Sequence, residues 1–482
     1  MNTKLVLHIL GLVLRVEAIL MLPSAAIGFA SHTGDGPDFL LSAAITFIVG
    51  QLLTLLPRKG VKMQARDGFA TVGLGWIVLS LFGALPYVFS GVIPNYIDAV
   101  FETVSGFTTT GATVLTQIEG LPTGVLFWRA QTQWMGGVGV LVLALALIPK
   151  LGEGSVYLMR AESPGPIKSK LTPRLGDTAK ILYIIYIGLT VGETICLRLA
   201  GMSWYEALTH SFTTISTGGF SVRNASIAAY DSMLIDWIII VFMFLSGINF
   251  ALLFYAVRRN FKAVFESEEL RSYTIMAVTA SALIVLNLVV HAGWELNAET
   301  ITDATFQVVT LMTTTGYMTY DYVLWPTFAQ TVLVLVMFAG ACAGSTAGGI
   351  KQIRVVPLFK NLHREIQRIL HPRAVKTIRC DGDRVEEPIL SGITLFFFAY
   401  ILLLLAGTLV VAWDDIGFTA AFTASLTCIS NVGPAFDVLG PTSNFSMLSG
   451  LSKIVLSLNM LLGRLEIMPL LLLVFPGLWK KR

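Results

Sequence analysis

A short polar pattern occurs four times in this chain of 482 residues, and every copy carries a glycine. The copies read TTTGAT, STGGFS, TTTGYM and SNVGPA, and their glycines are Gly111, Gly219, Gly316 and Gly433. An alanine stands twelve residues before each glycine, and an acidic residue precedes it in three copies, as Asp98, Glu206 and Asp303. A unit of about a hundred residues used four times predicts a pseudo-fourfold structure, and such polar loops in an apolar chain are typical of a pore.

The remainder of the chain has the composition of a membrane protein. Hydrophobic residues make up 55% of it and charged residues only 13%, whereas a soluble domain carries about 25% charge. Ten segments are apolar and long enough to cross a bilayer, which takes about 20 residues each. They lie near 5–30, 38–56, 70–90, 124–149, 179–200, 232–257, 274–291, 328–345, 389–412 and 450–476.

The basic residues predict the orientation of these spans. Most of the 33 Lys and Arg fall in the two tails and in alternate connections, and the opposite connections carry only Arg223. By the positive-inside rule both termini are cytoplasmic, and all four glycine loops then lie on the outer side.

Each glycine follows about ten residues that can form a helix, too few to cross the membrane. Such a segment must enter the membrane and turn back, which is tolerated only inside protein or beside water. Four helix C-termini would then direct partial negative charge at one point, where a cation is favoured. The acidic residue before each helix is expected to cap it, a role that Thr419, Asp414 or Asp415 would take in the fourth copy.

The loops are therefore candidates for an ion filter lined by carbonyl oxygens. The alternative is that they are ordinary outer turns, which four copies in register disfavour. The candidate filter residues are Thr109, Thr110, Gly111, Thr217, Gly218, Gly219, Thr314, Thr315, Gly316, Asn431, Val432 and Gly433.

The predicted fold is an all-α integral membrane protein with ten transmembrane helices. Four repeats of span, pore loop and span follow a two-helix N-terminal extension. The predicted units are 1–67 for the extension, 68–150, 151–260, 261–350 and 387–482 for the repeats, and 351–386 for a basic cytoplasmic connector. We expect no enzyme, because the sequence has no nucleophile–base or metal-ligand pattern, and its four cysteines form no CxxC.

Three further motifs carry a family resemblance: FWRAQTQWMGGVGVLVLALALIP (127–149), AGACAGSTAGGIKQIR (339–354) and LLGRLEI (461–467). With the four loops they resemble the Trk/Ktr/HKT superfamily of potassium and sodium transporters, and within it the bacterial Trk-type potassium-uptake membrane subunit. The resemblance covers essentially the whole chain.

The resemblance implies potassium uptake across the bacterial inner membrane, with K⁺ at the four loop glycines and no organic cofactor in this chain. Serine at the first glycine is associated with sodium preference in relatives, so Gly111 implies potassium. It also implies a homodimer in membrane lipid and a cytoplasmic nucleotide-binding regulatory subunit of the TrkA type, with no nucleic acid. The fourth loop departs from the pattern at Asn431, Val432 and Pro434, so the placement of its carbonyls is not assumed from the other three.

A small-residue stretch at 339–350 marks a possible gate. Its glycines and small side chains either allow close helix packing or form an unwound loop that blocks the pore, the interpretation that the resemblance supports. The candidate gate residues are Gly344, Ser345, Thr346, Gly348, Gly349 and, in the last span, Arg464. An arginine at mid-membrane costs roughly 2.5–3.5 kcal/mol, so Arg464 either pairs with Glu466 or a neighbouring helix, or lines the pore.

Other charged groups leave alternatives open. Arg129 and Lys453 either anchor loop carbonyls or snorkel to the interface. Glu17, Glu193 and Asp236 are either structural or couple protons. The connector lies on the inner leaflet or docks a regulatory protein.

Two other functions are alternatives: a sodium-permeable or sodium-coupled transporter of the same fold, and a secondary transporter of organic solutes. The second would have inverted repeats, whereas all four units here enter from one side.

Overall fold

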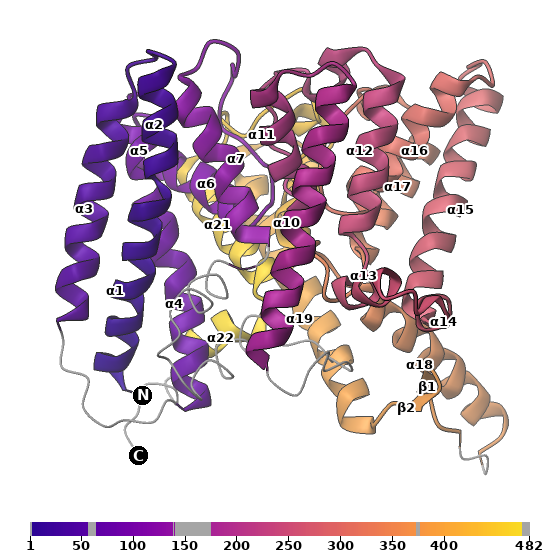
Figure 1. Cartoon of the computed structure of the whole chain (residues 1–482). Coiled ribbons are helices and arrows are strands. Elements are labelled where there is room, and N and C mark those ends of the chain that lie inside the picture. Colours follow the sequence, from indigo (N-terminus) through magenta and orange to yellow (C-terminus); the bar gives the residue numbers. More distant parts are fainter. Residues whose placement is uncertain (1, 56–63, 138, 140–174, 373–375, 475–482) are drawn as a thin grey trace.

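The computed structural model describes residues 2–55, 64–137, 139, 175–372 and 376–474. The described chain is helical apart from loops and one short hairpin. An N-terminal set of helices precedes four groups, each with a long helix, a short helix, a polar loop and a second helix (Figure 1). The N-terminal helices are α1 (Thr3–Leu20), α2 (Leu22–Ala30) and α3 (Gly36–Thr54).

The four groups follow in sequence order. Group one comprises α4 (Ala65–Gly83), α5 (Leu85–Phe89), α6 (Tyr96–Phe107) and α7 (Thr123–Gly137). Group two comprises α10 (Leu175–Leu199), α11 (Trp204–Ile215), η2 (Ser226–Tyr230), α12 (Met233–Ser246), α13 (Phe250–Val257) and α14 (Phe261–Phe265). Group three comprises α15 (Glu268–His291), α16 (Ala298–Met312), η3 (Tyr322–Leu324), α17 (Thr327–Ala339) and α18 (Gln352–Leu370).

A two-stranded antiparallel hairpin separates the last two groups. It pairs β1 (Arg379–Cys380) with β2 (Asp383–Arg384). Group four then comprises α19 (Glu387–Val411), η4 (Ala412–Asp414), α20 (Phe418–Ser430), η5 (Asp437–Leu439), α21 (Gly450–Arg464) and α22 (Met468–Val474).

Six helical stretches in the described residues are long and apolar enough to cross a membrane. They are Thr3–Ala30, Gly36–Thr54, Arg66–Phe89, Lys180–Leu199, Glu268–His291 and Glu387–Asp414. A seventh is possible if α12 and α13, which meet at a bend of 103°, form one span. Each of the seven coincides with a predicted span, whereas the complete set of ten stays a prediction.

Two of the other three predicted spans fall short because their second helices are interrupted, and the third is only partly described. Helix α17 ends at Ala339, and regular helix resumes only with α18. Helix α21 ends at Arg464, after which Glu466 and Ile467 have positive φ angles of 54° and 68°. The predicted span at 124–149 is described as helix only to Gly137, and most of its remainder lies outside the described residues. The sequence predicted an interruption in group three alone.

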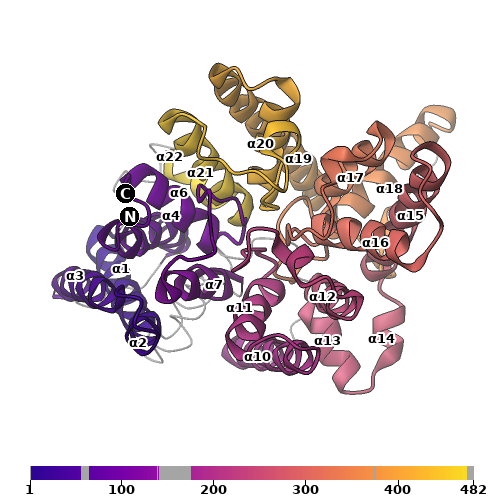
Figure 2. The same ribbon diagram turned by 90° about the horizontal axis from the view of Figure 1, so that it is seen from above.

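The four groups are arranged around a common centre, with α1, α2 and α3 on the outside (Figure 2). Neighbouring groups contact each other in the same way: the second helix of each group packs on the short helix of the next. The pairs are α7 with α11, α12 with α16, α17 with α20, and α21 with α6, which closes the circle. Shared apolar clusters join these groups, including one of Val104, Met135 and Leu461 and one of Leu311, Leu333 and Ile429.

The caps of the short helices correct part of the sequence prediction. Glu206 does form a capping box with Ser203 at α11. In α6 and α16 the capping side chains are Asn95 and Asn297, and the predicted Asp98 and Asp303 bond elsewhere.

The prediction was wrong for the fourth short helix. Helix α20 begins at Phe418, and its N-cap residue is Gly417, so neither Thr419 nor an upstream aspartate caps it. Asp414 accepts a bond from the Ser449 amide at the start of α21 (2.9 Å). The glycine lets the chain turn with φ at 87°, but it provides no side-chain acceptor for the helix N-terminus.

Candidate functional site

All four short helices end in the same turn, immediately before the loop glycines. The amide of the residue before each loop glycine bonds back to a carbonyl five positions earlier, as in a Schellman cap. These bonds join Thr110 N to Ser105 O (2.9 Å), Gly218 N to Thr213 O (2.8 Å), Thr315 N to Thr310 O (2.8 Å) and Val432 N to Thr427 O (2.9 Å).

The turn places a non-glycine residue in the left-handed region in every loop. These residues are Thr109 (φ 54°), Thr217 (55°), Thr314 (58°) and Asn431 (57°). A β-branched residue rarely adopts this conformation, which costs on the order of 1–3 kcal/mol and persists only where the surroundings enforce it. Three threonines held in this way indicate that the surrounding structure dictates the path of the loops.

The loops contact each other in a closed circle through their glycines. A Cβ atom on Gly111 would lie 2.2 Å from the Gly218 carbonyl oxygen, and the same holds around the circle. The remaining distances are 1.8 Å from Gly219 to Thr315 O, 2.1 Å from Gly316 to Val432 O and 2.6 Å from Gly433 to Thr110 O. No side chain fits at these positions, because the carbonyl of the neighbouring loop occupies the space. We call these four loops the glycine ring.

The fourth loop takes part in the ring despite its different sequence. Although Asn431, Val432 and Pro434 depart from the pattern, the Val432 amide bonds back to Thr427 as in the other turns, and the Val432 carbonyl faces Gly316. The difference lies in Asn431, whose side-chain amide donates to the Thr110 hydroxyl (3.0 Å) and to the Met460 carbonyl (2.9 Å). The asparagine therefore links loop four to loop one.

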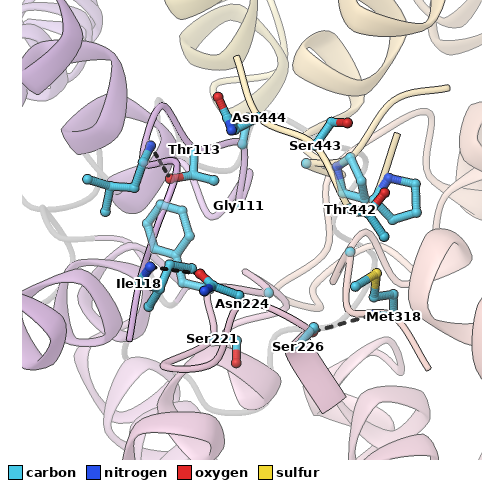
Figure 3. A pocket seen from close by; sticks show the side chains of 18 of the residues that line it. Gly111, Thr113, Ile118, Ser221, Asn224, Ser226, Met318, Thr442, Ser443 and Asn444 are labelled. Carbon is cyan, nitrogen blue, oxygen red and sulfur yellow. Dashed lines mark hydrogen bonds between the residues drawn. The ribbon is translucent and has the colours of Figure 1, made fainter. Parts of the chain in front are cut away.

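A cavity of about 120 Å³ opens on one side of the glycine ring, lined by all four glycines and by the segments that follow them. Residues from several groups surround its central opening (Figure 3). Asn224 accepts a bond from the Ile118 amide (2.7 Å), and Ser226 accepts one from the Met318 amide (3.4 Å). These bonds join loop one to loop two and loop two to loop three.

A buried ion pair supports loops one and two from behind. Arg129 on α7 donates through Nε to Glu102 on α6 (2.8 Å), and both side chains are almost completely buried. Glu102 also accepts bonds from Thr113 and from the Val114 amide (2.9 Å), while Arg129 donates to the Ser221 carbonyl (3.2 Å). Sequence reasoning missed Glu102, although an acidic residue in the middle of a predicted buried helix is itself a signal.

Lys453 performs the corresponding task between groups four and one. Its ammonium group donates to Asp98 on α6 (2.7 Å) and to the Ser446 carbonyl (3.0 Å). Both Arg129 and Lys453 thus bind loop carbonyls, which agrees with the anchor interpretation rather than with snorkelling. A further surface pair joins Arg223 to Glu206 (2.6 Å). Partial burial acts to raise the pKa of Glu206, but hydrogen bonds from Ser203 and Arg223 outweigh it and lower that pKa.

On the side of the ring opposite the cavity, Arg464 connects three groups. Its guanidinium donates to the Thr346 carbonyl (2.6 Å) and to the carbonyls of Gly136 (2.5 Å) and Gly137 (2.7 Å), and it lies 3.3 Å from the Thr109 hydroxyl. Glu466, the carboxylate that the sequence offered as a partner for Arg464, instead accepts bonds from Lys351 (3.1 Å) and from Arg354. The geometry places the charge of Arg464 directly beside the ring.

The predicted unwound segment in group three also reaches the ring. Non-helical backbone runs from Gly340, where φ is 60°, to Lys351, and we call this segment the inner loop. The Gly348 amide donates to the Thr314 hydroxyl (2.9 Å), and a Cβ on Gly348 would lie 2.4 Å from the Ser430 carbonyl oxygen.

The other candidate gate residues lie within the inner loop. The Gly344 carbonyl accepts a bond from the Phe250 amide (3.1 Å), and the Ser345 hydroxyl donates to the Cys342 carbonyl (2.6 Å). The Thr346 hydroxyl donates to the Ile215 carbonyl at the end of α11 (3.0 Å). Gly349 has a positive φ of 72° and lies beside Gly340. These contacts hold the inner loop against α11, α13 and the ring.

The remaining titratable candidates do not meet at the ring. Glu17 on α1 and Glu193 on α10 are buried, and Asp236 lies in the first turn of α12. His210 on α11 is hydrogen-bonded at both ring nitrogens, to the Glu206 carbonyl (2.8 Å) and the Ser221 hydroxyl (3.1 Å). That arrangement gives His210 a structural role, and proton coupling at Glu17, Glu193 and Asp236 stays a prediction.

Comparison with known proteins gives one consistent result. Residues 35–480 match the TrkH family, described as cation transport proteins. The chain is 38% identical to the Trk system potassium uptake protein TrkH of Escherichia coli (strain K12) and 39% identical to that of Halomonas elongata, each over 100% of both chains. It superposes on the crystal structure of the potassium transporter TrkH from Vibrio parahaemolyticus with a TM-score of 0.89, at 34% identity and 100% coverage of both chains. The chain therefore belongs to the TrkH family of cation transport proteins.

Proposed function

We propose that this chain takes up potassium across the bacterial inner membrane, and that K⁺ crosses at the glycine ring. The observation that carries the proposal is the closed circle in which each loop glycine faces a carbonyl of the neighbouring loop. In this proposal the ring lies at the centre of the pseudo-fourfold, ten-helix arrangement predicted from the sequence. The names of the relatives supply the substrate, and glycine rather than serine at Gly111 supports potassium over sodium.

The chemistry of the ring supports a cation as the transported species. Four helices end there, and the partial negative charge of each C-terminus favours positive charge at the centre. Backbone carbonyls of loops held by strained turns can replace the water around an ion without rearranging. The candidate ligands are the carbonyl and hydroxyl oxygens of the predicted filter residues of the ring.

The inner loop and Arg464 together form the gate in this proposal. The inner loop contacts the ring at Thr314 through Gly348, while Arg464 contacts the ring and the inner loop together, at Thr109 and Thr346. A positive charge beside the ring opposes the passage of a cation. Opening then requires the carbonyls that hold Arg464 to release it and the inner loop to withdraw.

The cytoplasmic side provides a surface for control. Helix α18 exposes Phe359, Leu362, Ile366 and Ile369 beside several basic residues. With both termini cytoplasmic, we propose this helix and the hairpin as the docking region for a nucleotide-binding subunit of the TrkA type. A homodimer in the membrane completes the proposed assembly.

Ion flux into vesicles that contain the purified full-length chain tests the proposal. Potassium flux that exceeds sodium flux, with the difference reduced by Gly111→Ser, is the expected result. Equal flux of the two ions would identify a sodium-permeable relative instead. If neither the protein nor an Arg464→Ala variant carried either ion, the ring would not be a cation path, and transport of organic solutes would be the function to examine.

A further inference from the structure

The four loops of the glycine ring have the same backbone turn, but their side-chain support differs. In loops one and three, threonines on both sides of the strained residue bond to each other, Thr108 to Thr110 (2.8 Å) and Thr313 to Thr315 (2.8 Å). Loop two cannot form this contact, because Gly218 stands where the second threonine would be. It therefore needs support from elsewhere.

That support comes from Gln133 on α7, in the neighbouring group. Its side-chain nitrogen donates to the Gly218 carbonyl (2.6 Å), and its side-chain oxygen accepts a bond from the Phe220 amide (3.0 Å). The two bonds hold the backbone on both sides of Gly219. The side chain is completely buried, so water does not compete for either bond.

Gly218 and Gln133 fit each other as a pair. A Cβ on Gly218 would lie 2.4 Å from the side-chain Cδ of Gln133 and 2.5 Å from its oxygen. Any larger residue at position 218 would thus displace the amide that holds the loop. The absence of a side chain here is explained by the glutamine, since the corresponding positions in the other loops hold Thr110, Thr315 and Val432.

The bond from Gln133 acts on one of the carbonyls that form the ring. The Gly218 carbonyl is the group that faces Gly111. An amide donor fixes the direction of this carbonyl and withdraws part of its electron density, and both changes affect how tightly an oxygen cage discriminates between ions of different size. The ring therefore contains one carbonyl that is tuned by a side chain of the neighbouring group.

We propose that Gln133 is a positioning residue for ion selectivity, acting through the backbone of loop two. The inference rests on the proposed function, because it assumes that the glycine ring selects the ion. Its consequence is that the four loops contribute unequally. Loop two is held by a side chain 85 residues away in sequence, whereas loops one and three each contain a threonine pair of their own.

Replacement of Gln133 by methionine tests this inference, because methionine keeps the length of the side chain and removes both bonds. The control is Gln131→Met in the same helix, where the glutamine is also buried but accepts a bond from Ser24 (3.3 Å) away from the ring. Two ratios are measured on the full-length protein: potassium to sodium flux in vesicles, and potassium to sodium concentration for half-maximal thermal stabilisation. The second does not depend on whether the gate is open.

We expect both ratios to shift toward sodium by a factor of about five to ten in Gln133→Met, as for the loss of a buried hydrogen bond. Gly218→Ala should produce the same shift, and Gln131→Met should leave the ratios unchanged. The double variant Gln133→Met/Gly218→Ala should be no worse than either single one, because the two changes remove the same interaction.

An unchanged ratio in a folded Gln133→Met protein would overturn the inference, as would strictly additive effects in the double variant. A shift of equal size in Gln131→Met would also overturn it, by showing that the ratio follows the general packing of α7. A wild-type protein that does not distinguish the two ions would instead contradict the proposed function, so the two failures can be told apart.

Discussion

The two sides of the glycine ring follow different rules. Toward the cavity, four loops share one turn and one pattern of glycine-to-carbonyl contacts. On the opposite side the groups diverge: α12 and α13 meet at a bend of 103°, group three has its inner loop, and group four contributes Arg464. Binding a spherical ion requires oxygens from all sides, which favours similar loops, whereas blocking a path requires only one segment and one charge. The difference suggests that selection and gating are separable in this molecule.

Gly219→Ala is the strongest test of the side toward the cavity, where the four loops share one turn. The added methyl group would lie 1.8 Å from the Thr315 carbonyl oxygen, and the residue would keep a φ of 77°. Because only backbone can yield here, we expect potassium uptake to fall at least about a hundredfold. Uptake by cells that depend on this protein measures the effect.

The matched control is Gly188→Ala on α10, where the new methyl group meets no neighbouring atom. Uptake close to the wild-type rate in Gly219→Ala would show that the loops are not in contact as described.

The support behind the ring is tested by Glu102→Gln. The change leaves Arg129 buried without its carboxylate partner, a situation that costs about 3–5 kcal/mol. We expect a large loss of thermal stability, measured as the unfolding temperature of the purified protein. Glu266→Gln is the comparison, because its pair with Lys262 (3.8 Å) is exposed and such pairs contribute about 0–1 kcal/mol. Equal losses in the two variants would contradict the role given to the buried pair.

Arg464→Ala tests the side opposite the cavity, where the groups differ. Removing the charge beside the ring should raise potassium flux by about tenfold or more, since a unit charge near an ion path raises the barrier by several kcal/mol. The ratio of potassium to sodium flux should change much less than the rate. Arg464→Lys keeps the charge and serves as the control. Unchanged flux together with a lower amount of folded protein would assign Arg464 to stability alone.

The smallest expected effect concerns the link between the two sides. Thr314→Val removes the hydroxyl that accepts the Gly348 amide (2.9 Å) and leaves that donor buried without a partner. An unpaired buried group costs about 1–3 kcal/mol, so the inner loop should be released more often. Background flux of the closed protein is expected to rise severalfold, and Thr314→Ser should behave as the wild type. A Thr314→Val protein whose background flux equals that of the wild type would show that this contact does not hold the inner loop.

Much of the described architecture is readable from the sequence. The four glycines, the half-length helices before them and seven of the predicted segments are local patterns of composition and spacing, and they appear where expected. The interruption at 340–351 is likewise signalled by its glycines and small residues.

The unpredicted features depend on partners distant in sequence. Gln133 holds loop two, 85 residues away, and Arg464 reaches Thr346, 118 residues away. The bend between α12 and α13 was missed because Asn249, which caps α13 by accepting the Ala251 amide, lies inside a continuous apolar run. The cap of the fourth short helix was misjudged because Asp414, near its start, binds the N-terminus of α21 instead. Only the folded arrangement shows which polar groups meet.

The closure of the circle between groups four and one has a consequence for synthesis. Asp98 and Lys453 meet across 355 residues, and Asn431 bonds to Thr110 across 321. The last of the four groups must therefore leave the ribosome and insert before the ring can close. We expect a chain interrupted earlier to have no complete ion path, so that unfinished copies of the protein do not depolarise the membrane.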